Sequence, residues 1–179
     1  MDFINDLSEE AKVALGLAIA EKMYVFIDKE DDGYHVGEKA LEDCWKWLSG
    51  KELSADDLCN YIDSEDYMDV AEFANKQKDE QKQYGWYSVL DAVSYTAYQA
   101  YRRENKKFVP QVLEVIDDET LIVMWENAIE SKMIEMDELN TLREYLIDHY
   151  PKKDHDNNHL FFINKKDINH LNWIYRRYE

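Results

Sequence analysis

One stretch of the chain, residues 84–103, carries apolar or aromatic side chains on nearly every face when it is drawn as a helix. Its sequence, YGWYSVLDAVSYTAYQAYRR, is long enough for about five turns at 3.6 residues per turn. A helix that is apolar all round is typically buried inside a bundle. One face, with Trp86, Val89, Val93 and Ala97, has the residues of an ordinary core. The pattern therefore predicts a central helix with these four side chains buried.

The opposite face of this helix carries tyrosines around a single carboxylate, Asp91. At about 100° per residue, Tyr87, Tyr95 and Arg102 fall on the same side as Asp91. Buried tyrosine hydroxyls need hydrogen-bond partners, and one carboxylate can accept from several donors. We therefore expect Asp91 to be partly buried and to accept a hydrogen bond from a tyrosine or from Arg102. The face is interpreted either as a polar seam between helices or as a surface for a partner.

Helical patterns also fill most of the remaining chain. Helix starts are marked by Ser8-Glu9-Glu10 and by Ser54, and Pro110 suits the first turn of a short helix. The expected helices cover about 8–28, 34–48, 54–62, 70–74, 110–116, 117–129 and 137–150, with a last one from Asp167. Only 5 glycines and 2 prolines interrupt 179 residues, which favours long helices over many tight turns. The sequence predicts a single-domain, all-α bundle of about seven to eight helices.

The charge of the chain narrows the range of partners. There are 39 acidic and 21 basic residues, a net charge of -18. Residues 151–179 hold six Lys or Arg and four Asp or Glu, a net +2, which leaves -20 on residues 1–150. Such a field repels nucleic acid and anionic membranes and attracts basic proteins. The longest apolar run, Ala11–Ile27, is interrupted by charges and is short for a membrane span.

The cysteines and the N-terminus indicate a compartment. Cys44 and Cys59 form neither a disulfide framework nor a C-x-x-C pair, so we expect two reduced thiols. The first residues, MDFINDLSEEAK, have no basic segment ahead of an apolar core and do not resemble a secretory signal. We expect a cytoplasmic protein.

The C-terminal residues are treated as an extension of the body, which spans residues 1–150. Residues 151–179 carry a set of large apolar side chains: Leu160, Phe161, Phe162, Ile163, Trp173 and Ile174. Burying one such side chain is worth about 1.5–3 kcal/mol. We therefore expect the extension to pack on the body or on a second copy of the chain, with Lys152–His159 as the link.

Candidate chemistry is sparse. Asp28, Glu30, Asp32 and Gly33 stand at positions one, three, five and six of an EF-hand loop, but Lys39 occupies the twelfth position, where a bidentate Glu is required. His155 and His159 lie in a polar loop where no helix fixes their spacing. No phosphate-binding loop and no nucleophile or dinucleotide motif is present. We expect no catalytic residues, no metal and no cofactor.

Three stretches carry a resemblance to a known family: LSEEAKVALGLAIAEKMY, ALEDCWKWLSGKELSADDL and GWYSVLDAVSYTAYQAYRRENKKFVPQVLEVIDDE. Together they resemble the Imm6 immunity proteins of bacterial polymorphic toxin systems, over roughly residues 1–150. The resemblance implies an all-α cytoplasmic protein, encoded beside a toxin, that binds the toxin and blocks it. It implies no catalytic residues. Many such toxins are nucleases with basic clefts, which an acidic inhibitor can fill.

Two acidic segments at helix ends are the predicted surface for the toxin. Both are dense in carboxylates, and the predicted residues are Glu30, Asp31, Asp32, Asp63, Glu65, Asp66 and Asp69. The partner is expected to be a toxin protein rather than nucleic acid or membrane, and the chain is expected to be a monomer or a weak dimer. Two alternatives remain open. One is an acidic helical module for another basic protein, and the other is a metal-dependent hydrolase of small anionic substrates.

Overall fold

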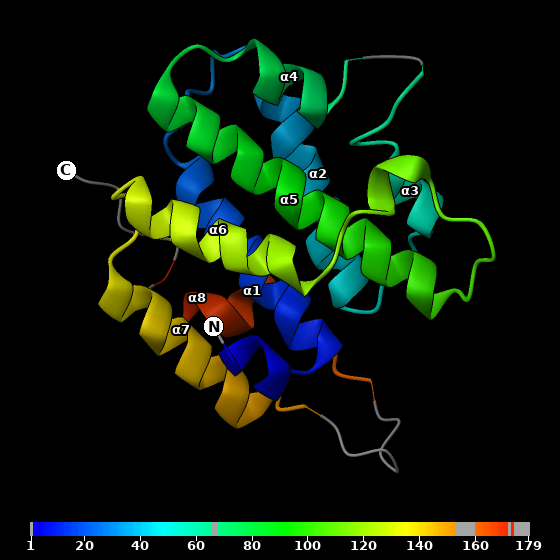
Figure 1. Cartoon of the computed structure of the whole chain (residues 1–179), viewed down its shortest axis with the longest axis vertical. Coiled ribbons are helices and arrows are strands. Elements are labelled where there is room, and N and C mark those ends of the chain that lie inside the picture. Colours follow the sequence, from blue (N-terminus) through cyan, green and yellow to red (C-terminus); the bar gives the residue numbers. More distant parts are fainter. Residues whose placement is uncertain (1, 66–67, 153–159, 172, 174–179) are drawn as a thin grey trace.

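Two long helices, α1 (Glu9–Tyr24) and α5 (Glu80–Arg103), pack against each other at the centre of the molecule (Figure 1). The computed structural model describes residues 2–65, 68–152, 160–171 and 173. Helix α1 is apolar on both of its sides and is buried almost throughout, with Leu15, Leu17 and Ile19 fully covered. Gly16 lets the helix that carries Leu121 pack closely on α1, because a Cβ there would meet the side chain of Leu121 at 3.1 Å.

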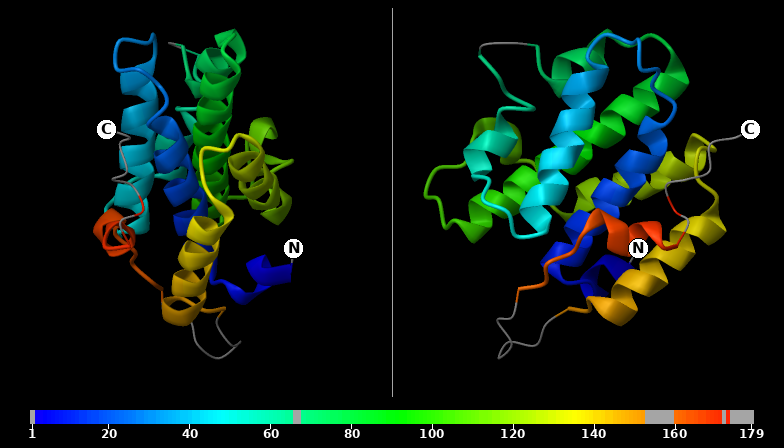
Figure 2. Two further views of the ribbon diagram at one scale, coloured as in Figure 1. Left: turned by 90° about the vertical axis from the view of Figure 1, so that its left-hand side faces the viewer. Right: turned by 180° about the vertical axis from the view of Figure 1, so that it is seen from behind.

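The other helices cover this central pair. In the side view of Figure 2, α2 (Tyr34–Leu48) lies on one side of it and α6 (Asp118–Glu130) on the other. The short helices α3 (Ala55–Cys59) and α4 (Val70–Lys76) pack on α5, and α7 (Met136–His149) packs on α1. A last helix, α8 (Lys165–Asn169), and two 3-10 helices, η1 (Asp2–Asp6) and η2 (Gln111–Leu113), complete the described chain.

The predicted fold class is confirmed. The described residues form eight α-helices and no strand, and Trp86, Val89, Val93 and Ala97 are each at most 1% exposed. Several predicted boundaries were wrong. The first helix ends at Tyr24 rather than near Asp28, because the backbone then tightens and Ile27 turns inward to pack beside Gly85. The third helix ends at Cys59, and the segment after Pro110 forms only one 3-10 turn.

Side-chain caps explain why many of the helices begin where they do. Ser8 accepts a hydrogen bond from the backbone of Ala11, and Ser54 forms a capping box with Asp57. Asp69, Asp79 and Asp117 cap α4, α5 and α6 in the same way. Part of the acidity of the chain is therefore used at helix starts, where a carboxylate satisfies free backbone N–H groups.

The described part of the C-terminal segment lies against the body. The indole N–H of Trp173 donates to the backbone oxygen of Ala18 at 2.8 Å, and Lys165 pairs with Glu21 at 2.5 Å. Ile163 and Ile168 are fully buried. These contacts support our proposal that residues 151–179 are an extension docked on residues 1–150. Ile174 and most of the proposed link, 153–159, lie outside the described residues.

Two further features bear on the environment of the chain. Cys44 and Cys59 are both free and buried, and burial raises the pKa of the Cys44 thiol to about 12. None of the described helices combines the length and the apolar character needed to span a membrane.

Candidate partner-binding site

One lysine fixes the acidic loop between α1 and α2. Lys82, on α5, forms ion pairs with Asp28 at 2.7 Å and with Asp31 at 2.6 Å. The hydrogen bonds to these two carboxylates raise the pKa of Lys82, which keeps the ammonium charged. Gly33 then starts α2 with φ at 83°, and a Cβ at this position would lie 2.4 Å from the ring of Phe73. The ammonium group of Lys82 thus joins two carboxylates of this loop, those of Asp28 and Asp31.

Most of the carboxylates predicted to bind the partner are exposed to solvent. Glu30 and Asp32 are exposed on the loop, and Asp63 and Glu65 are exposed on the chain between α3 and α4. Asp66 lies outside the described residues. The four exposed groups are free to meet a partner without first breaking a buried contact.

Two of the predicted carboxylates have structural contacts instead. Asp31 is half-buried and is bound by Lys82. Asp69 is only 7% exposed, and it accepts hydrogen bonds from the backbone N–H groups of Ser64 at 3.1 Å and Glu72 at 3.0 Å. Replacing either residue would disturb the fold as well as the surface, so neither is a clean probe of binding.

A pocket of about 580 Å³ opens beside the loop, where the end of α1 meets the turn between α6 and α7. Its lining includes apolar surface from Tyr24, Ile27, Tyr34 and Met133. Its acidic lining residues are Glu21, Asp28, Glu30, Glu135 and Glu138. Two lysines, Lys22 and Lys29, line it as well, and Lys82 and Lys165 pair with Asp28 and Glu21 from outside the lining. We call this site the acidic pocket.

The inner wall of the acidic pocket is stabilised by ion pairs. Lys22 is buried, pairs with Glu138 at 2.6 Å and lies over the ring of Trp173 at 4.5 Å. Glu21 pairs with Lys165, on α8. These contacts join α1, α7 and the C-terminal segment. Glu30 differs, because it forms no ion pair with any described residue.

A second pocket, of about 460 Å³, lies on the other side of the same loop. It is lined by Asp31 and Asp32 together with Met68, Phe73 and Trp86. Met68 directly precedes Asp69, so the structure brings the end of the second predicted segment to the first. At the other end of the second segment, Asp63 stays beside α3, where its backbone N–H donates to Cys59.

The described residues offer no candidate metal centre. No three of their His, Cys, Asp and Glu side chains are grouped closely enough to hold an ion. His155 and His159, which the sequence analysis assigned to a polar loop, lie outside the described residues.

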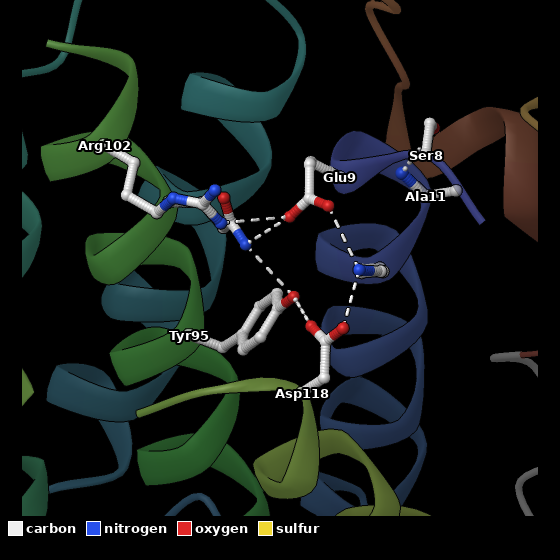
Figure 3. Close-up of polar contacts among 8 residues, drawn as sticks. Ser8, Glu9, Ala11, Tyr95, Arg102 and Asp118 are labelled. Atoms are coloured by element: carbon white, nitrogen blue, oxygen red, sulfur yellow. Dashed lines mark hydrogen bonds and ion pairs between the residues drawn. The ribbon is translucent and has the colours of Figure 1, made fainter. Parts of the chain in front are cut away.

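The tyrosine face of α5 is arranged differently from our expectation. Figure 3 shows that the hydroxyl of Tyr95 donates to Asp118 at 2.7 Å and that Arg102 approaches Glu9 at 3.5 Å. Lys12, only 7% exposed, bridges Asp118 at 2.7 Å and Glu9 at 3.0 Å. The network joins α1, α5 and α6. Its donors and acceptors satisfy one another, which identifies it as a structural seam.

Asp91 takes no part in this network. It is half-buried as predicted, but the predicted hydrogen bond from a tyrosine or from Arg102 is wrong. No described residue donates to its carboxylate. Burial raises the pKa of Asp91 to about 7, because the charged form loses water and gains no partner.

The comparison with family models decides what kind of protein carries these features. The model of the family described as Immunity protein Imm6 matches residues 11–140. The chain belongs to the Imm6 immunity protein family. No curated protein and no solved structure matches it. The match spans α1 to the start of α7, so the acidic pocket of this Imm6 protein, with lining residues between 21 and 138, lies within the family domain.

The acidic pocket of this Imm6 protein as a whole was not predicted from the sequence. Glu30 was predicted as a partner residue, but Glu21, Glu135 and Glu138 were not. Residues 21–34 and 133–138 meet only because α1 packs against α6 and α7. The one local signal was the pair of carboxylates in the Asp137-Glu138 helix start, which by itself indicates a cap.

Proposed function

We propose that this immunity protein binds a cognate toxin of a bacterial polymorphic toxin system in the cytoplasm and blocks the toxin's active surface. The match to an immunity family over residues 11–140 carries the proposal. The protein acts by binding and not by catalysis, as a monomer or a weak dimer. The partner is a protein rather than nucleic acid or membrane, which the net charge of -18 supports.

The contact surface in this proposal is the acidic end of the molecule around the α1–α2 loop. The exposed carboxylates of Glu30, Asp32, Asp63 and Glu65 supply its charge. A toxin of the basic nuclease class would be attracted to this surface over several ångströms, and its basic substrate cleft would then contact these carboxylates. Asp31, Asp66 and Asp69 belong to the same two segments, with Asp31 and Asp69 in supporting contacts.

The test reverses charge at exposed positions alone. Glu30→Lys, Asp32→Lys and Glu65→Lys together should lower the association rate with the toxin encoded by the neighbouring gene by at least about tenfold at low salt. The matched control is Glu114→Lys, Glu126→Lys and Asp148→Lys, which changes the net charge equally at exposed sites elsewhere. Full protection of toxin-expressing cells by the first variant, with its fold intact, would place the contact elsewhere. The exposed Tyr87 side of α5 is then the next surface to test.

Two other functions are separated by simple measurements. An acidic helical module for an unrelated basic protein would leave toxin-expressing cells unprotected while still binding its own partner. A metal-dependent hydrolase would retain stoichiometric metal after dialysis. Either result would replace the immunity proposal.

A further inference from the structure

The acidic pocket combines two chemical properties. Part of its lining is apolar and aromatic, with the rings of Tyr24 and Tyr34 stacked at 5.1 Å, and part is acidic, with five carboxylates. A volume of about 580 Å³ falls in the range of ligand-binding pockets, about 300–1,000 Å³. It offers room for a long side chain together with adjoining backbone.

The paired carboxylates of the pocket are separate from those that remain available. Glu21, Asp28 and Glu138 each have a lysine partner at 2.5–2.7 Å. Glu30 is exposed and forms no ion pair within the described chain, whereas Glu135, also exposed, takes part in the capping box of α7. Glu30 therefore supplies the available negative charge of the pocket, and its other carboxylates have contacts within the chain.

We propose that the acidic pocket binds an arginine side chain of the partner protein. That the partner is a toxin rests on the proposed function. The apolar stem of arginine would lie on Tyr24, Ile27 and Met133, as long cationic side chains do along apolar surface. The guanidinium would stack on Tyr34 and bond to Glu30 at the rim. Arginine suits the site better than lysine, because its planar group both stacks on rings and binds carboxylates through two N–H groups.

A capped peptide, acetyl-Gly-Arg-Gly-amide, tests the pocket without any toxin. In ¹H–¹⁵N spectra of the full chain, saturable shifts should appear at residues 24–34 and 133–138. The same peptide with citrulline, which is neutral and nearly the same shape, should bind about tenfold more weakly. Equal binding of the two peptides, or shifts confined to other residues, would overturn the inference.

Two exposed valines provide a matched pair of variants. Val25 lines the pocket and is 46% exposed, whereas Val123 lies outside it on α6 and is 42% exposed. Val25→Arg should fill the pocket with a cation from the chain itself and weaken binding of the arginine peptide at least about tenfold, while Val123→Arg should not. Glu30→Gln should weaken binding of the peptide and leave the spectrum of the free protein otherwise unchanged.

Protection assays in toxin-expressing cells distinguish a failure of this inference from a failure of the proposed function. Loss of protection by Val25→Arg, with protection retained by Val123→Arg, supports the use of the pocket by the partner. Protection equal to wild type by both variants overturns the inference and leaves the immunity function standing. If the wild-type protein fails to protect, the proposed function is overturned. The peptide titration would still decide whether the pocket binds arginine.

Discussion

Replacing Asp91 with asparagine is expected to stabilise the protein, because the wild-type carboxylate is half-buried without a donor. Burial raises the pKa of Asp91 from its ordinary 3.8 to about 7. One pKa unit corresponds to about 1.36 kcal/mol, so the shift sets an upper bound of about 4 kcal/mol on the cost of the charged form. Water still reaches the partly exposed group and screens it, so we expect about half of that value, ~2 kcal/mol.

The effect of pH has a definite sign. Between pH 3.8 and 7, the folded state holds a proton on Asp91 that the unfolded chain has lost, so the free energy of unfolding falls as pH rises. The cost is complete above about pH 7 and small near pH 4. The Asp91→Asn variant lacks this titration. Its advantage over wild type should therefore be about 2 kcal/mol at pH 8 and less than about 1 kcal/mol at pH 4.5.

Urea denaturation at the two pH values measures this difference directly. Subtracting wild type from variant removes the titration of every other group, and Glu126→Gln, at an exposed position, controls for the loss of one negative charge. A variant that is less stable than wild type would show that Asp91 has a stabilising partner. An advantage that is the same at both pH values would show that the carboxylate titrates normally and is well hydrated. Either result would refute the reasoning.

Two further changes test the packing of the core. Trp173→Ala removes an indole that is 3% exposed and hydrogen-bonded to Ala18, so we expect the free energy of unfolding to fall by about 3–5 kcal/mol. The control Leu160→Ala, at a side chain that is 41% exposed, should change it little. In calorimetry, the melting temperature should drop by about 10 °C for Trp173→Ala alone, and equal melting temperatures for the two variants would mean that the indole is not packed. Lys12→Met leaves the half-exposed carboxylate of Asp118 without its cation and Glu9 with Arg102 alone, and we expect a loss of about 2 kcal/mol in urea. Although burial lowers the pKa of Lys12, its hydrogen bonds to both carboxylates raise it overall, so this contribution should persist up to pH 10 and fall only above it.

Local patterns predicted the helices well wherever the signal itself was local. Residues 34–48 were expected as one helix and form α2 with those bounds, because Gly33 and Ser49-Gly50 delimit it. The central helix was identified by its apolar faces, since a segment covered on all sides needs apolar residues on all sides. The end of the first helix was missed, because Ile27 continues the apolar pattern although the backbone has already left the helix.

Contacts between helices were beyond the reach of the same patterns. The spacing of Tyr95 and Asp91 showed that they share a face of α5, but not which helix would pack beside it. Asp118, at the start of α6, accepts the hydrogen bond from the hydroxyl of Tyr95 instead. The acidic pocket depends in the same way on the meeting of residues 21–34 with 133–138. Of the parts of this pocket, only the acidic loop could be predicted from the sequence, because its carboxylates are adjacent in the chain.

The distribution of lysines connects the stability of this protein with its proposed role. A chain with a net charge of -18 is destabilised by its own repulsion. Lys12, Lys22 and Lys82 each pair with carboxylates at a junction between helices, where repulsion would otherwise separate the elements. The carboxylates of Glu30 and Asp32 lie beyond these pairs, on the surface. The fold therefore neutralises negative charge at these helix junctions and leaves other carboxylates, among them Glu30 and Asp32, on the surface. In the proposed function, a basic partner would lower the remaining repulsion when it binds them.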